Sequence, residues 1–350
     1  MQTVERKTDL AHKLLYDIDR LYAQTSSFDQ KILIPEVYDK SFQPIVDICT
    51  TYSALKMNVS YSDTVERLKL PKYDPKNIIV CFSGGRDSYV TARHYVKLGY
   101  NVVLYYVAGL NAGYSAGGHE QHIVEGAAEQ LGCKLVTESI RYHGYHDWFE
   151  HPLKNYLLWS MALSWGIRND WSIKIATGNF SSSKLDDNPF AVCGGDCIEV
   201  LRSFETIVRR FIPSFHIYHS NRSISTTMNY FLKHYGELKF VGSCMTPVRF
   251  KNQFRKRTTK NYGVELLPNR CGCCWKDCVE YIWAVDHKLV DINRPYYLHC
   301  INVIANTMRR ERGWRPYFAF DVWNEYMLYP FKKSTLYEEL QYARIPVIER

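Results

Sequence analysis

The sequence predicts an α/β protein built on a doubly wound, mostly parallel sheet. Residues 77–82 form a short, continuously apolar run, which is typical of a parallel strand covered on both faces. Further apolar runs follow it, and helical patterns of about ten to fifteen residues separate them, as right-handed crossover connections require. Glycines stand where two of these helices should end. Together these observations favour an open sheet with helices on both sides.

The elements can be placed in order along the chain. A helix should follow the first strand and end at Gly99, and a second helix should end at Gly132. A long helix then covers the region before the fourth strand. The expected strands are 77–82, 102–107, 134–137 and 173–176, and the expected helices are 88–98, 119–131 and 153–165.

Four regions are predicted. Residues 1–72 are expected to form a helical N-terminal extension, because Leu10, Leu14 and Ile18 recur at helical spacing. Residues 73–240 form the α/β domain, in which we expect a nucleotide site. Residues 241–285 are rich in cysteine, and residues 286–350 are expected to be helical and are rich in aromatic residues.

Composition narrows the classes of protein. The 350 residues are 46% hydrophobic and 23% charged, as in ordinary soluble globular proteins. No run of about 18 apolar residues is present, so we expect no membrane span. The charged stretch Met1–Leu10 lacks an apolar secretory core, which predicts a cytoplasmic protein, where the eleven cysteines serve as thiols or metal ligands. The net charge of +8 suits an anionic partner such as a nucleotide or a nucleic acid.

The segment from Ser83 to Ser88, with the sequence SGGRDS, carries the strongest chemical signal. It joins a buried strand to a helix, so backbone amides and the positive end of the helix dipole converge on one place. Adjacent glycines at 84 and 85 allow the backbone to approach phosphate oxygens, and two serines add hydroxyl donors. Phosphate would repel Asp87, which therefore suits magnesium or a role in holding the loop. A tight turn without any ligand is the structural alternative.

We predict that this loop binds a nucleotide at the carboxyl edge of the sheet, where ligands of such folds gather. No lysine follows the glycines, so the loop is not the mononucleotide type, and it lacks the glycine spacing of dinucleotide binders. The predicted nucleotide-binding residues are Ser83, Gly84, Gly85, Arg86, Asp87, Ser88, and the strand-end residues Val107 and Gly178.

The strand followed by SGGRDS resembles the signature of the PP-loop ATP pyrophosphatase superfamily. That resemblance implies an adenine nucleotide alpha hydrolase-like fold, with ATP and Mg²⁺ as cofactors. It further implies cleavage of ATP to AMP and pyrophosphate and activation of an acceptor as its adenylate. Asp87 and Ser88 are then the predicted catalytic residues of the loop.

The cysteine cluster predicts a zinc site. Zinc binds four soft ligands in a tetrahedron, and a Cys-x2-Cys turn supplies two of them. The predicted ligands are Cys244, Cys271, Cys274 and Cys278, with Cys273 as a substitute for a neighbour. Four thiolates would make the zinc structural. Buried free thiols and a reducible catalytic disulfide are the alternatives.

Several islands of sequence resemble the 7-cyano-7-deazaguanine synthases, a family in queuosine biosynthesis. They are 152–155, 175–179, 195–199, Ser243–Cys244 and the cysteine cluster. The resemblance implies an ATP-dependent ligase that converts 7-carboxy-7-deazaguanine to the amide and then the nitrile with ammonia. It also places Asp196 against the substrate. The spacing departs from the family, because Cys274 and Cys278 stand one residue further apart and 26 residues separate Cys244 from Cys271.

Three other functions remain open. A PP-loop thiolase or a phosphoadenylyl-sulfate reductase-like enzyme would keep the loop but need a redox-active cysteine. An adenylating enzyme that modifies a base in a nucleic acid would explain the basic residues at 251–260 and 309–315, which equally suit solvated loops. A nucleotide-binding regulator without turnover is the third. Nucleic acid and a second copy of the chain, through the aromatic C-terminal stretch, are candidate partners.

Overall fold

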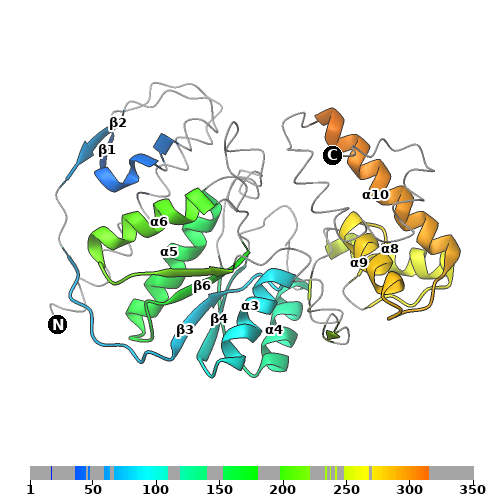
Figure 1. Ribbon diagram of the computed structural model, residues 1–350, viewed down its shortest axis with the longest axis horizontal. Helices are drawn as coiled ribbons and strands as arrows, with labels where there is room; N and C mark the ends of the chain where they lie inside the picture. The colour runs from blue at the N-terminus through cyan, green and yellow to red at the C-terminus, as the bar shows by residue number, and fades with distance from the viewer. Residues whose placement is uncertain are drawn as a thin grey trace. The chain divides into compact units, whose positions relative to one another are not determined.

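A computed structural model describes residues 17, 36–44, 46–47, 59–63, 67–108, 119–139, 153–179, 198–220, 233–234, 237, 241–242, 248–267 and 270–314 (Figure 1). Asp196, Cys244, the glycine-rich stretch 109–118 and the aromatic stretch 315–350 lie outside these residues. The expectations that concern them therefore stay predictions.

The central element is a parallel sheet with the order β5-β4-β3-β6-β7. The chain starts in the middle, moves outward through β4 and β5, and then returns to the other side of β3 through β6 and β7. All four pairings are parallel. The predicted parallel sheet is thus confirmed, with strands β3 (Asn77–Cys81), β4 (Asn101–Ala108), β5 (Lys134–Ser139), β6 (Ile175–Asn179) and β7 (Ile217–Ser220).

Helices connect these strands; the first three were predicted from the sequence pattern, whereas the last helix and the strand β7 that follows it were not. Both predicted glycine ends are confirmed, with φ of 71° at Gly99 and 65° at Gly132. After each helix, an amide bonds back five residues (Tyr100 to Tyr95, and Cys133 to Ala128), which satisfies terminal carbonyls. The connecting helices are α3 (Arg86–Lys97), α4 (His119–Leu131), α5 (Leu153–Arg168) and α6 (Ile198–Phe211).

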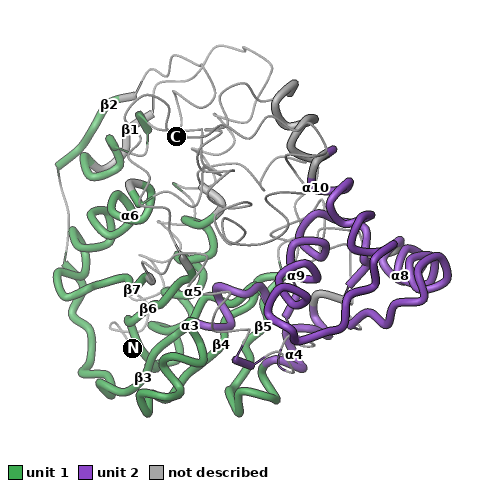
Figure 2. Tube along the Cα trace, turned by 45° about the vertical axis from the view of Figure 1, so that its right-hand side comes forward, with its two compact units in different colours: residues 1–83, 91–113, 128–221 green, residues 84–90, 114–127, 222–350 purple. Residues whose placement is uncertain are grey.

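The chain divides into two compact units (Figure 2). Unit 1 consists of residues 1–83, 91–113 and 128–221, and its core lies between the sheet and helices α5 and α6. Trp159, Tyr156 and Phe204 are fully buried there and contact one another at ring-centroid distances of 5.1–6.0 Å. Burial on both faces explains why all five residues of β3 are buried.

Unit 2 consists of residues 84–90, 114–127 and 222–350. It has a separate hydrophobic core. Ile282 and Trp283 pack there with Tyr296. Its helices are α8 (Val248–Tyr262), α9 (Trp275–Asp286) and α10 (Arg294–Trp314). The predicted helical character of the region beyond 286 is confirmed over α10. The SGGRDS loop contributes its residues from Gly84 onward to this unit.

The N-terminal extension corrects one expectation. Residues 1–72 were expected to be helical; their described part has helical residues at 17, 43–44 and 46–47 and the short 3-10 helix η1 (Lys40–Phe42), but it also contains β1 (Glu36–Asp39) and β2 (Val59–Ser62), paired in parallel. β2 alternates a β-branched or aromatic residue with serine, and β1 has Val37 and Tyr38 at its centre; both compositions favour a strand. The helical periodicity at Leu10–Ile18 says nothing about this later segment.

Among the helices that the structure describes, none combines the length and the apolar character that crossing a membrane would need.

We predict that Gly166→Ala destabilises unit 1. A Cβ at Gly166, in α5, would lie 2.1 Å from the Ser172 carbonyl oxygen and 2.6 Å from the Cδ1 of Ile79. Neither the backbone nor the packed core can yield, so the free energy of unfolding should fall by about 3 kcal/mol. Gly99→Ala is the control, because a Cβ there meets no atom and only the positive φ costs about 1 kcal/mol. Equal urea midpoints for the two variants would contradict this account.

Candidate active site

The predicted phosphate loop leaves β3 at the topological switch point of the sheet. Phe82 extends the strand by donating its amide to the Tyr105 carbonyl at 2.8 Å, and Ser83 is exposed. Helix α3 then begins at Arg86. Its first turn is secured by Ser88, whose hydroxyl donates to the Gly85 carbonyl at 3.0 Å, and by the Tyr89 amide, which donates to the same carbonyl. The strand–turn–helix geometry expected for anion binding is present.

Gly84 is required at its position for two reasons. Its φ is 71°, in the left-handed region, and a Cβ would lie 3.2–3.3 Å from methyl groups of Val124 and Ile123 on α4. Its carbonyl also accepts a hydrogen bond of 2.7 Å from the amide of Gly242. A Cβ on Gly242 would in turn stand 3.0 Å from the Cδ1 of Ile123. The loop therefore depends on Gly242, a residue that the sequence pattern did not single out.

The remaining loop residues differ in what their side chains face. Asp87 is half-buried in the first helical turn, where a carboxylate stabilises the helix dipole and could hold Mg²⁺. Ser88 is buried. The guanidinium of Arg86 is also buried and forms an ion pair with Glu280 of α9, with Nη1 and Oε1 3.6 Å apart. This partner indicates that Arg86 anchors the loop to protein.

Two predicted nucleotide-binding residues belong to the strands that flank β3. Val107 is buried in the hydrophobic core of unit 1 near the carboxyl end of β4. Gly178 is half-buried near the carboxyl end of β6. Both stand at the predicted edge of the sheet, and Val107 contributes packing there through its side chain.

The cysteines at 271–274 form a tight turn, the cysteine knuckle, immediately before α9. The amides of Cys273 and Cys274 donate to the Sγ of Cys271 at 3.4 and 3.3 Å, so backbone donors surround this sulfur. Gly272 has a φ of 71°, and a Cβ would lie 2.5–3.0 Å from Leu266, Thr258 and Tyr296. Only glycine fits this turn.

Three ligand atoms converge at the knuckle: the sulfurs of Cys271 and Cys274 and a carboxylate oxygen of Asp277 lie within 4.8 Å of one another. Two thiols and a carboxylate are compatible with a metal ion such as Zn²⁺. Burial raises the pKa of Asp277 to about 7, and the nearby Arg270 opposes that shift. The sequence pattern missed Asp277, although Cys-x2-Cys-x2-Asp was visible in it.

Cys278 occupies a different environment from the one predicted. It is fully buried in the hydrophobic core of unit 2 beside Cys300. Burial, and next the hydrogen bond with Cys300, raise the pKa of the Cys278 thiol well above its usual range. Its sulfur is not among the three ligand atoms that converge at the knuckle. The structure thus brings together Cys271 and Cys274 of the predicted set, joins Asp277 to them, and leaves Cys278 outside.

Helix α8 covers the knuckle with one face. Thr258 is buried and donates its hydroxyl to the Cys271 carbonyl at 3.2 Å. Lys256, Arg257 and Lys260 are exposed. The basic stretch 251–260 was expected to be a loop, but it lies within the helix α8. Its buried residues, Lys251 and Thr258, lie seven positions apart and so fall on one face at helical spacing.

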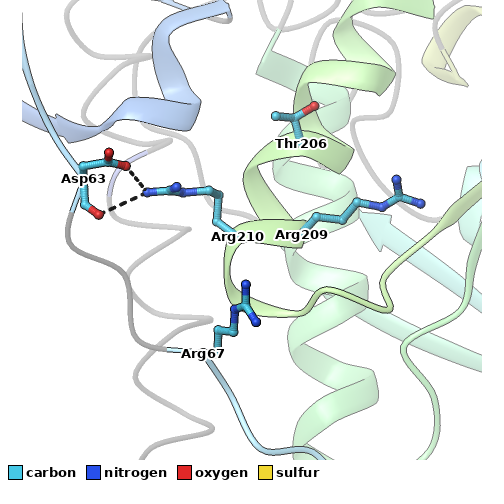
Figure 3. Close-up of a pocket in the computed structure, with 5 residues that line it drawn as sticks. All are labelled: Asp63, Arg67, Thr206, Arg209 and Arg210. Carbon is cyan, nitrogen blue, oxygen red and sulfur yellow. Dashed lines mark hydrogen bonds and ion pairs between the residues drawn. The ribbon is translucent and has the colours of Figure 1, made fainter.

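A shallow surface pocket in unit 1 lies elsewhere (Figure 3). Arg210 pairs with Asp63 at 2.6 Å, and Arg67, Arg209 and Thr206 complete the lining. It surrounds the last turns of α6, just before β7 begins, and hence the amino edge of the parallel sheet. The predicted nucleotide edge is the opposite one, so this pocket has no part in the site.

Comparison with known proteins gives a partial relationship. No family model matches the chain, and no solved structure does. A tRNA-5-methyluridine(54) 2-sulfurtransferase from Pyrococcus horikoshii is 37% identical over 101 residues, which are 29% of this chain and 30% of that protein. The chain thus matches under a third of that relative's length.

We predict that the zinc content of variants distinguishes the cysteines of the knuckle from Cys278 and Cys300. Cys271→Ser, Cys274→Ser and Asp277→Asn should each lose most of the zinc that co-purifies with the protein, because each removes a converging ligand. Cys278→Ser and Cys300→Ser should retain it. The measurement is elemental analysis of protein that circular dichroism shows to be folded. Zinc lost from Cys278→Ser but kept by Asp277→Asn would restore the four-cysteine set.

The parallel sheet with its central phosphate loop, together with the similarity to a tRNA 2-sulfurtransferase, fits the PP-loop superfamily.

Proposed function

We propose that this protein is an ATP-dependent PP-loop enzyme that cleaves ATP to AMP and pyrophosphate and transfers the adenylyl group to an acceptor. The observation that carries the proposal is the turn at Gly84, which joins the central parallel strand β3 to the first turn of α3. Amides of a first helical turn point outward along the axis and bind anions. The partial similarity to a tRNA 2-sulfurtransferase supports the same chemistry.

Each loop residue has a proposed role in that reaction. Amides from Gly84 to Ser88 would hold the β- and γ-phosphates, while Asp87 would hold Mg²⁺, which would supply positive charge to the reaction. An acceptor oxygen attacks the α-phosphorus, the α–β bridging bond breaks, and pyrophosphate carries away its electron pair. Because charge develops on the leaving oxygens, preorganised donors and the cation lower the barrier.

The acceptor has two candidates. The sequence islands favour a carboxylate of the 7-carboxy-7-deazaguanine type, with ammonia displacing AMP and Asp196 contacting the substrate. The function of the similar sulfurtransferase favours a base in tRNA, where a base oxygen would be adenylated and sulfide would displace AMP. The exposed cations of α8 suit a nucleic acid, because they can contact phosphates.

We predict that Asp87→Asn lowers AMP formation by about 10²- to 10³-fold, because the variant loses the charge that positions Mg²⁺. AMP and pyrophosphate are measured from ATP labelled at the α-phosphate. Asp63→Asn is the control, since it removes the same charge from the surface pocket at the other edge of the sheet and should leave the rate unchanged. No AMP from folded wild-type protein with any acceptor, or equal rates for Asp87→Asn and wild type, would contradict the proposed function.

The product identifies the acceptor. With 7-carboxy-7-deazaguanine and ammonium, the deazaguanine assignment predicts a nitrile and two AMP per product. With tRNA and sulfide, the thiolation assignment predicts a nucleoside in which sulfur replaces oxygen and one AMP per product. Mass spectrometry after parallel incubations distinguishes the two. A nitrile excludes the tRNA assignment as the main activity, and a thionucleoside excludes the deazaguanine assignment.

A further inference from the structure

Four charged side chains lie buried together in unit 2 and join the phosphate loop to the cysteine knuckle. Arg86 belongs to the loop, Arg270 immediately precedes the knuckle, and Asp277 and Glu280 stand one turn apart on α9. All four are less than 10% exposed. Glu280 contacts both cations, at 3.6 Å from Arg86 and 2.6 Å from Arg270, and Arg270 also lies 3.7 Å from Asp277. Two positive and two negative charges balance.

A second connection reaches the loop from the other side. The Arg270 guanidinium donates through Nη1 to the Val241 carbonyl at 2.6 Å. The next residue, Gly242, donates its amide to the Gly84 carbonyl at 2.7 Å. Arg270 is therefore linked to Gly84 through backbone and to Arg86 through Glu280. Both sides of the glycine turn are held by a single guanidinium.

The same group is fixed to the knuckle. Asp277 accepts hydrogen bonds from the amides of Cys271 and Gly272 at 2.7 and 3.1 Å. Its carboxylate thus fixes the turn that presents the sulfurs. Because Arg270 is bonded covalently to Cys271, any shift of the knuckle moves the guanidinium that holds the loop.

Stability alone gives a poor account of this arrangement. Burying four charges is costly, and well-packed apolar residues of similar volume often serve as well or better. Ion pairs between charges that are fixed in place instead favour one geometry. The arrangement therefore favours a role in setting the conformation of the loop.

We propose that Arg270 and Glu280 are positioning residues of the phosphate loop and that they couple nucleotide binding to the order of the cysteine knuckle. The coupling rests on the proposed function, since it requires a nucleotide in the loop. Linkage is reciprocal, so a nucleotide that orders the loop must also order the knuckle, and a disturbed knuckle must weaken nucleotide binding.

The test measures alkylation of Cys271 and Cys274 by iodoacetamide in the full chain, with Cys133 as the internal reference thiol. Mass spectrometry follows each site with and without magnesium and α,β-methylene ATP, which cannot release pyrophosphate. In the wild type, nucleotide should slow alkylation at the knuckle about fivefold or more. Glu280→Gln should abolish that protection and weaken nucleotide binding about tenfold.

Two further variants keep the test decisive. The double variant R86Q/E280Q removes one charge of each sign and leaves the Arg270–Asp277 pair. Its buried charges therefore stay balanced, and it should fold even if Glu280→Gln does not. This double variant should also lose the protection of the knuckle by nucleotide. Glu138→Gln is the matched control, because its ion pair with Arg168 is exposed, and it should keep protection. Without nucleotide, Arg86→Gln should already speed alkylation of the knuckle.

The outcomes separate the two proposals. Nucleotide that binds the wild type without protecting the knuckle, or protection that survives in R86Q/E280Q, overturns the coupling and leaves the proposed function intact. A wild type that binds no nucleotide overturns the proposed function. In that event the nucleotide-free comparison decides the positioning role: unchanged alkylation in Arg86→Gln overturns it, and faster alkylation supports it.

Discussion

The buried guanidinium of Arg270 is the constraint on which the arrangement of unit 2 depends. It reaches two carboxylates and a backbone carbonyl in a place where water does not compete. Removing one partner of such a buried group leaves an uncompensated charge, which typically costs about 3–5 kcal/mol. The segment 241–242, helix α9 and the loop at Gly84 are therefore tied to one geometry. The hydrophobic core of this unit covers the remaining faces of the helices, but apolar contacts do not by themselves fix one orientation of the groups that they bury.

In unit 1, the parallel sheet determines where the proposed nucleotide site lies. Because β3 is central and its neighbours continue in opposite directions along the sheet, its carboxyl end opens at a switch point. The chain then turns at Gly84 and starts a helix, which presents amides and a positive dipole end. The arginine-lined pocket at the other edge of the sheet has charged side chains, but it lacks such a turn from a strand into a helix. Charge alone therefore does not mark the site; the geometry of the turn does.

The cysteines show how environment assigns roles to identical side chains. Cys271 and Cys274 lie in a turn whose amides point at sulfur, and a carboxylate stands beside them. Cys278, one helical turn further on, faces an apolar core and another thiol. The first environment gathers ligand atoms for a cation, whereas the second is an apolar core that favours the neutral thiol. A cluster of side chains that could hold a metal ion and a packed core thus lie at the same helix.

The sequence by itself determined the buried strand, the SGGRDS turn that follows it, the glycine ends of the helices and the parallel character of the sheet. These features are local, because periodicity, glycine conformation and backbone donors act within a few residues. Only the tertiary structure decided that Arg86 points to Glu280, that Gly242 closes on the loop, and that Asp277 stands where Cys278 was expected. Such contacts join residues up to 194 positions apart. The partners are selected by where the folded chain places each side chain, and the spacing of residues along the sequence does not specify that.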